Sequence, residues 1–188
     1  MRLYSLQLVY KQDNRVTPLV AAHDLSSFGF FERKTAKEFM DFTGKLIVER
    51  SAPDSGRSQV PEQSYICHCF VRNDKLAGIC ISDSEYPARV AQSLLSQVLI
   101  DVYTCSQAQF KQLEAELARY QDPKKADTLS KVQGDVNDTK AIMTQTMENL
   151  LDRGEKLDDL VARSDALSAQ SKAFYETAKR TRRCCNAL

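Results

Sequence analysis

The chain has 188 residues and a formal net charge of +1, which is enough length for one domain of ordinary size and an appendage. A charge this close to zero predicts neither nucleic acid nor a strongly charged substrate as the partner. Hydrophobic residues make up 43% of the chain, so we expect a packed core. No run approaches the roughly 18 apolar residues of a membrane-spanning helix, and no apolar leader region is seen, so we expect a cytosolic protein with reduced cysteines.

The first 122 residues carry the pattern of one α+β domain. Alternation predicts a strand over 1–10 that forms a hairpin with a second strand over 18–25. A helix is predicted over about 33–50, then a short edge strand near Ser58, then a second hairpin over 64–71 and 75–82. Pro87 suits the first position of a helix that runs to about 103, and Pro123 is expected to end a last helix. Antiparallel hairpins with segregated helices indicate an α+β layered fold.

Three neighbouring side chains, Cys67, His68 and Cys69, invite a metal or catalytic interpretation. On a strand the two thiols point to one face and the imidazole to the other. Zinc requires four converging ligands, and a Cys–His catalytic pair requires both groups on one side. We therefore expect small buried cysteines in a sheet, with no metal, no cofactor and no catalytic residue in the chain.

Residues 127–183, here called the heptad segment, carry apolar or small residues at alternating steps of three and four. That spacing predicts a coiled coil. Its expected core positions are Leu129, Val132, Val136, Met143, Leu150, Leu157, Leu160, Leu167 and Phe174. Polar residues such as Thr139 and Ser171 also fall in the seam, and Gly134 and Gly154 each cost about 1 kcal/mol of helix propensity. The segment should therefore be incompletely helical until it meets partner helices.

A charge interrupts the seam, and a lipid address ends the chain. Arg153 is in phase with the seam, three residues after Leu150 and four before Leu157, and its five donors can be buried only against acceptors from other chains. Residues 184–188 read Cys-Cys-Asn-Ala-Leu, which is a prenylation box on Cys185 with a second cysteine beside it. Cys184 and the preceding basic residues are candidates for the second membrane signal that one lipid chain requires.

The heptads, the central arginine and the double-cysteine terminus together resemble the R-SNAREs, in particular those with an N-terminal longin domain and lipids in place of a transmembrane helix. The segment Leu150-Leu151-Asp152-Arg153-Gly154-Glu155-Lys156-Leu157 carries the resemblance most clearly. It implies a longin domain over 1–122, a SNARE motif over 127–183 and a lipidation tail over 184–188. The longin fold has a five-stranded antiparallel sheet with one helix on one face and two on the other.

The resemblance implies a function in vesicle docking and fusion. Arg153 would meet one Gln from each of three SNARE helices in a parallel four-helix bundle, and zippering would draw two membranes together. Cys185 would carry a prenyl group and Cys184 a palmitate or second prenyl, although Leu188 favours geranylgeranyl over farnesyl. The protein would be cytosolic and lipid-anchored on the cytoplasmic face of endomembranes such as the Golgi, endoplasmic reticulum, endosome or vacuole.

Longin domains are also known to fold back on their own SNARE helix, which implies a closed, autoinhibited state. Phe39 and Phe42 are the candidate lining of a lipid groove, with Phe28, Phe30 and Phe31 nearby in sequence; equally, any of these rings could fill the core. Two other functions remain open. The chain could be a self-acylating or acyl-transfer protein that uses the longin cysteines, or a longin adaptor whose C-terminal helix is only a tether.

Overall fold

A six-stranded sheet forms the centre of the computed structural model, which describes residues 1–12, 15–52, 55–62, 65–101, 109–126 and 142–185. The strands lie in the order β2 (Arg15–His23), β1 (Leu3–Gln12), β5 (Leu76–Asp83), β4 (Tyr65–Val71), β3 (Gly56–Glu62) and β6 (Met143–Thr144). Strands β1 to β5 pair antiparallel with their neighbours. They form the predicted five-stranded sheet from two hairpins and an intervening edge strand.

The sixth strand corrects the prediction of five antiparallel strands. β6 belongs to the heptad segment and pairs parallel with β3, with Ser58 opposite Met143 and Gln59 opposite Thr144. The pairing is extended by a hydrogen bond from the Gln145 amide to the Gln59 carbonyl at 2.9 Å. An edge strand leaves unpaired backbone groups, so β3 offers the heptad segment a pairing site that periodicity alone does not reveal.

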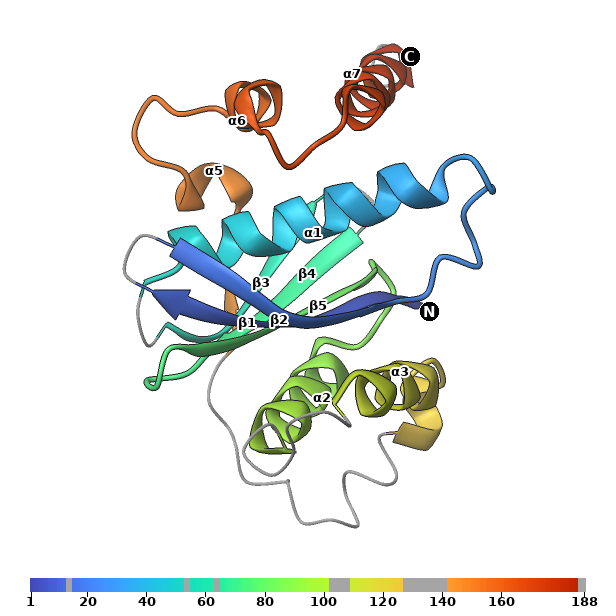
Figure 1. Ribbon diagram of the computed structural model, residues 1–188, viewed down its shortest axis with the longest axis vertical. Coiled ribbons are helices and arrows are strands. Elements are labelled where there is room, and N and C mark those ends of the chain that lie inside the picture. Colours follow the sequence, from blue (N-terminus) through green and yellow to red (C-terminus); the bar gives the residue numbers. More distant parts are fainter. Residues whose placement is uncertain (13–14, 53–54, 63–64, 102–108, 127–141, 186–188) are drawn as a thin grey trace.

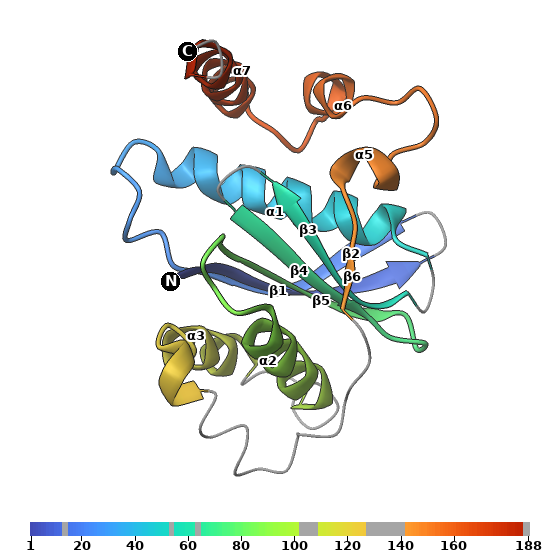
Figure 2. The same ribbon diagram turned by 180° about the vertical axis from the view of Figure 1, so that it is seen from behind.

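Helices cover both faces of the sheet (Figure 1). Helix α1 (Arg33–Arg50) lies on one face, and α2 (Ala88–Asp101) and α3 (Gln109–Arg119) lie on the other. Both views place α5 (Met147–Leu150), α6 (Leu157–Arg163) and α7 (Ala169–Cys185) outside α1, so that the heptad segment forms an outer layer (Figure 2). Helix α1 therefore lies between the sheet and the outer helices α6 and α7, whereas β6 of the same segment joins the sheet itself.

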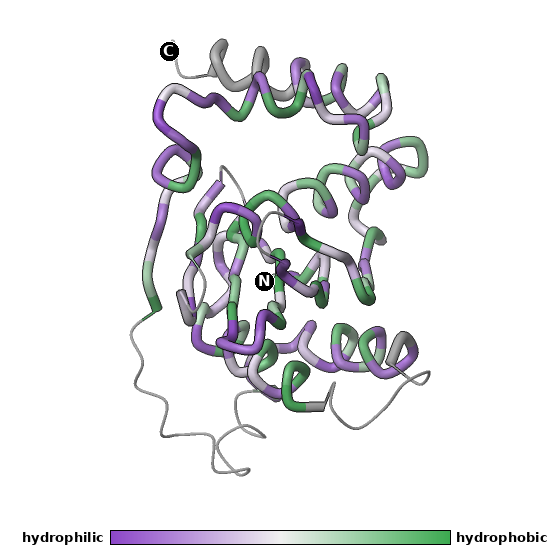
Figure 3. The backbone as a smooth tube through the Cα atoms, turned by 60° about the vertical axis from the view of Figure 1, so that its left-hand side comes forward, coloured by the Kyte–Doolittle hydropathy of each residue, from purple (hydrophilic) through white to green (hydrophobic). Residues whose placement is uncertain are grey.

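Sequence periodicity accounts for the helices of the domain. Hydrophobic and hydrophilic stretches alternate along the helical parts of the chain (Figure 3), as expected for amphipathic helices. In α1 the buried positions include Ala36, Met40, Thr43 and Ile47, whose spacing of three and four faces the sheet. α2 and α3 bury Leu94 and Leu113 in a separate cluster on the other face. α3 ends at Arg119, before Pro123, and Pro123 begins a further helical turn over 123–126.

Lysine 11 fixes the end of α1 to the sheet. Its side chain is buried, and Nζ donates to the carbonyls of Val48 at 2.8 Å, Glu49 at 3.2 Å and Ser51. The last carbonyls of a helix have no partner within it, and a cation is favoured at that end. Burial lowers the pKa of Lys11, which is the cost of placing this cap in the interior.

The described part of the heptad segment is not one continuous helix. Its residues 142–183 belong to a strand and three helices, the last of which runs on to Cys185, with extended linkers at Leu151 and Ser164. Gly154 lies in the first break with φ of 89°, a backbone conformation that other residues rarely adopt. The described part of the predicted seam is therefore divided among one strand and three helices.

Candidate functional site

The candidate site is the interface between α1 and the heptad segment. Met147 and Leu150 of α5 are buried in the same apolar cluster as Ile47 of α1 and Ile81 of the sheet, and Leu157 and Leu160 pack against that cluster while partly exposed. Residues predicted to form a four-helix core thus pack against the N-terminal domain. Full burial of such a side chain contributes roughly 1.5–3 kcal/mol, and the partly exposed Leu157 and Leu160 contribute less.

The nine predicted core residues have different environments. Leu150 and Leu167 are buried, Leu157 and Leu160 are half-buried, and Phe174 is 42% exposed. Met143 is 50% exposed and belongs to strand β6 instead of a helix, because its backbone pairs with β3. The remaining three core positions, Leu129, Val132 and Val136, lie outside the described residues.

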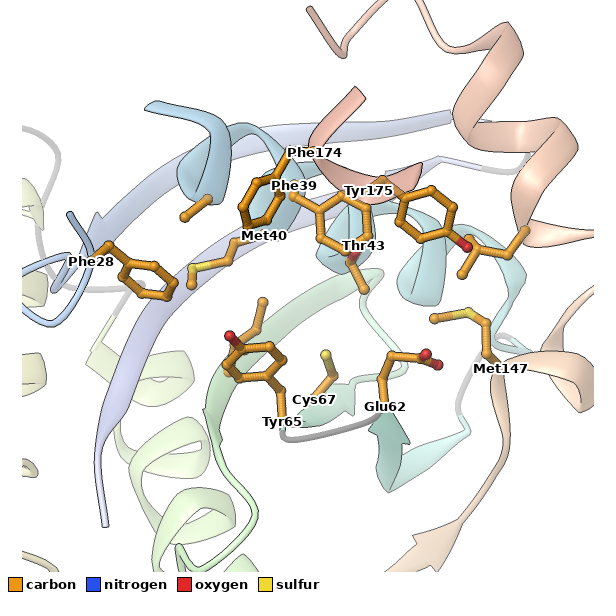
Figure 4. A pocket seen from close by; sticks show the side chains of 13 residues that line it. Phe28, Phe39, Met40, Thr43, Glu62, Tyr65, Cys67, Met147, Phe174 and Tyr175 are labelled. Carbon is orange, nitrogen blue, oxygen red and sulfur yellow. The ribbon is translucent and has the colours of Figure 1, made fainter. Parts of the chain in front are cut away.

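An apolar cavity of about 200 Å³ opens between α1, the sheet edge and the outer helices. Figure 4 shows side chains from all of these elements around it. Phe39 and Met40 come from α1, Tyr65 from β4, and Phe174 and Tyr175 from α7. The rings of Phe39 and Tyr175 stack with centroids 5.4 Å apart. The N-terminal domain forms one wall of this cavity and the heptad segment forms the other. We call this cavity the groove.

The two predicted groove residues, Phe39 and Phe42, line different cavities. Phe39 lines the cavity just described, whereas Phe42 lines a second one of about 650 Å³ between α1, β2 and the linker that contains Ser164. Three residues advance a helix by 300°, which leaves the two rings about 60° apart around α1. Of the other three phenylalanines, Phe28 lines the first cavity, but Phe30 and Phe31 are exposed.

A carboxylate on α1 caps the N-terminus of α7. Glu38 Oε2 accepts hydrogen bonds from the Ser171 hydroxyl at 2.7 Å and the Ser168 amide at 3.0 Å. These bonds hold the pKa of Glu38 at about 2. The first amides of a helix have no intrahelical acceptor and favour a negative charge, so a side chain from another element completes α7.

A second polar contact holds the segment around Arg153. Arg50 at the end of α1 donates to Asp152 Oδ2 at 2.6 Å and to Glu155 Oε1 at 2.8 Å. Asp152 is largely exposed, but Arg50 and Glu155 are less than a quarter exposed. The two bonds clamp the turn over 152–155, and Arg153 itself is exposed to solvent with no ion-pair partner among the described residues.

The cysteine cluster has no catalytic geometry. Cys67 and Cys69 are buried in β4, and burial raises the pKa of both thiols to about 12, so little reactive thiolate forms at neutral pH. His68 is also buried, its Nε2 lies 3.0 Å from Ser82 Oγ, and burial lowers its pKa to about 4. The expectation of small buried cysteines is confirmed. Within the described residues no cluster of three metal-ligating side chains is found.

The C-terminal cysteines end helix α7, and residues 186–188 of the box lie outside the described part of the chain. Among the described helices, none has the length and apolar character needed to cross a bilayer. The predicted role of Arg153 stays a prediction, and of the two predicted groove residues Phe39 lines the first cavity and Phe42 the second. Sequence reasoning missed Glu38, Arg50 and strand β6. No local signal marks the two charged residues, because each acts on a segment more than 100 positions away.

Comparison with known proteins agrees with this two-part arrangement. A family model described as a regulated-SNARE-like longin domain matches residues 25–124, and one described as synaptobrevin matches residues 128–186. The chain is 42% identical to the synaptobrevin homolog ykt6 of Schizosaccharomyces pombe and 37% identical to the synaptobrevin homolog YKT6 of Saccharomyces cerevisiae, with 98% of each chain covered. The chain therefore belongs to the longin-domain R-SNAREs, the non-enzymatic, synaptobrevin-like proteins of vesicle trafficking that assemble with other SNARE helices.

Proposed function

We propose that this R-SNARE is held closed by its longin domain until three Gln-bearing SNARE helices replace that domain on the heptad seam. The observation that carries the proposal is the packing of Leu150, Leu157 and Leu160 against the longin cluster. The same leucines are required for a four-helix bundle. Because a side chain can occupy one core at a time, the closed packing and the bundle exclude each other.

Arg153 is the proposed register residue of the bundle. In the closed state it is exposed, so its guanidinium is hydrated. In the bundle it would be buried in phase with Leu150 and Leu157, and three glutamine carbonyls would accept its hydrogen bonds. A slip in register would leave the charge buried without acceptors, which costs roughly 3–5 kcal/mol. This penalty selects the partner set and the alignment.

Membrane attachment is proposed to come from lipids on the two C-terminal cysteines. Cys185 stands at the prenylation position, and Cys184 is the site for a palmitate or second prenyl. The groove lined by Phe39 and Tyr175 is the proposed shelter for the first chain before the protein reaches the cytoplasmic face of an endomembrane, such as the Golgi, endoplasmic reticulum, endosome or vacuole. A free prenyl chain would otherwise expose about 0.8 kcal/mol of apolar transfer energy per CH₂ to water.

The closed state is tested by the distance between spectroscopic labels on Lys45 of α1 and Gln170 of α7, two exposed positions. The distance should be short in the full chain and should lengthen when three Gln-SNARE helices are added. A short distance that survives bundle assembly would show that the two packings are compatible, which contradicts the proposal.

The anchor is tested separately by fractionating cells that express cysteine variants. Cys185→Ser should lose the membrane pool, whereas Cys184→Ser should retain the first lipid and attach less stably. Firm membrane association of Cys185→Ser would remove the lipid-anchor proposal. The rival acyl-transfer function requires reactive longin thiols, and the buried, high-pKa Cys67 and Cys69 do not favour it.

A further inference from the structure

Two adjacent phenylalanines are fully presented to solvent at the tip of the loop between β2 and α1. Phe30 is 78% exposed and Phe31 is 92% exposed, more than any other large hydrophobic residue for which exposure is described. Their rings contact each other edge-on with centroids 5.5 Å apart. Aromatic side chains are normally among the most buried surfaces of a protein, so an exposed adjacent pair indicates an interaction site.

Hydrogen bonds and ring packing hold the loop over residues 24–32 in a defined conformation. Asp24 Oδ1 accepts from the Ser26 amide at 3.0 Å, and the Asp24 amide donates to the Tyr4 carbonyl at 2.8 Å. Further on, Glu32 Oε2 accepts from the Gly29 amide at 3.2 Å. Phe28 packs edge-on against Tyr4, with ring centroids 5.6 Å apart. These contacts fix the base of the loop and leave its tip pointing away from the domain.

The tip adjoins the apolar groove. Phe28 lines the groove together with Phe174 and Tyr175 of α7, and Figure 4 shows Phe28 at one end of the ring of lining side chains. Phe30 and Phe31 follow it by two and three residues. The chain therefore passes from the groove wall to the exposed pair within one short loop, and an apolar chain leaving the groove at this end would meet the pair.

Charge around the loop favours a bilayer as the occupant. Glu32, Arg33 and Lys34 follow the tip, so the exposed stretch carries one acid and two cations, and the acid is bound to the Gly29 amide. Lys34 is 79% exposed, and Glu38 lies 4.0 Å from it. A convex tip with two aromatic rings and adjacent cations suits the headgroup–acyl boundary of an anionic membrane. A protein partner for such a tip would require a matching pocket, whereas a membrane requires only depth.

We propose that the loop over residues 24–32 is a membrane-contact loop, in which Phe30 and Phe31 insert into an anionic bilayer beside the mouth of the groove. The inference rests on the proposed lipid-bearing closed state for its purpose, which is to place the groove against the membrane that receives the lipid. The insertion itself depends on this chain's own side chains and not on the lipid, so the two can be tested apart.

The chain contains no tryptophan, so a single introduced indole reports on its own position. Full-length unlipidated Phe31→Trp is mixed with vesicles of phosphatidylcholine with or without phosphatidylserine. With phosphatidylserine present, the emission should shift to shorter wavelength and be quenched by bromine-labelled acyl chains. The matched control is Ile100→Trp, a 61% exposed hydrophobic position on α2 at the opposite face of the sheet, which should do neither. An unshifted, unquenched Phe31→Trp signal overturns the proposal.

A second measurement uses vesicle co-sedimentation of the unlipidated chain. Phe30→Ser with Phe31→Ser should weaken binding on the order of a hundredfold, since two aromatic side chains are withdrawn from the acyl region. Ile100→Ser should leave binding unchanged, and equal losses in the two variants overturn the inference. The anchor is judged independently: if the loop inserts while Cys185→Ser stays on cell membranes, the lipid proposal fails and the loop proposal stands. If the loop does not insert while Cys185→Ser leaves cell membranes, the loop proposal fails and the lipid proposal stands.

Discussion

Replacing Glu38 by alanine should open the outer layer while leaving the longin domain folded. The carboxylate accepts one hydroxyl and one amide bond from the start of α7, at 2.7 and 3.0 Å. Charge-assisted bonds contribute roughly 1.5–3 kcal/mol each when well buried. The Glu38 side chain is 21% exposed, which reduces that value, so we expect a loss of about 2 kcal/mol. This corresponds to a roughly thirtyfold rise in the open population.

Hydrogen exchange measures this opening directly, because amide protection reports the free energy of local unfolding. Peptides from α6 and α7 should exchange about thirty times faster in Glu38→Ala, while peptides from β1 and β5 should not change. Glu114→Ala, at an exposed carboxylate on α3, is the matched control. Equal protection of α7 in the two variants would show that Glu38 does not hold the helix.

The cap also has a defined pH dependence. The pKa of Glu38 is about 2 in this state, below its ordinary value of 4.5. The carboxylate's contribution is therefore complete above about pH 4.5 and declines as pH falls toward 2. Exchange of α7 in the wild-type chain should accelerate across that window, and Glu38→Ala should lack this component. If both chains accelerate equally there, another group controls the transition.

Three further predictions test the contacts around this interface. Lys11→Met removes the cap on α1 and should destabilise the domain by about 3 kcal/mol, which lowers the midpoint of thermal unfolding by about 10 °C, whereas the exposed Lys45→Met should have little effect. Arg50→Ala should speed assembly with Gln-SNARE helices at low salt, and the difference should shrink as salt screens the clamp; a salt-independent rate would contradict this. Arg153→Ala should leave the circular dichroism melt unchanged but weaken bundle assembly, and unimpaired assembly would remove Arg153 from its proposed layer.

The sequence was sufficient for the elements whose periodicity matches their environment. α1 was predicted over 33–50 and occupies Arg33–Arg50, and the predicted strands lie within a few residues of the observed ones. In the helices one face meets a core, and the central strands β1 and β5 are buried on both faces, so the spacing or the continuity of hydrophobic residues follows their burial. The buried cysteines of β4 could be predicted for the same reason.

Local sequence failed where a distant element decides the conformation. The seam around Met143 predicts a helix, yet its backbone pairs with the free edge of β3. The break around Gly154 interrupts a pattern that suits a continuous helix in a bundle. The sequence also did not predict that Phe30 is exposed whereas Phe39 lines the groove. Each outcome depends on tertiary neighbours that periodicity does not contain.

The closed state and the proposed bundle differ less in buried apolar area than in how their charged side chains are paired or hydrated. Leucines such as Leu150 are buried on the longin domain and would be buried again among partner helices, so this term largely cancels between the two states. Opening removes the Glu38 cap and the Arg50 clamp, and the bundle must also dehydrate Arg153, which is exposed when closed. An apolar partner could offset none of these losses. Helices that bring glutamine carbonyls to the arginine supply the missing acceptors, so the polar contacts, more than the leucines, make release selective for the correct partners.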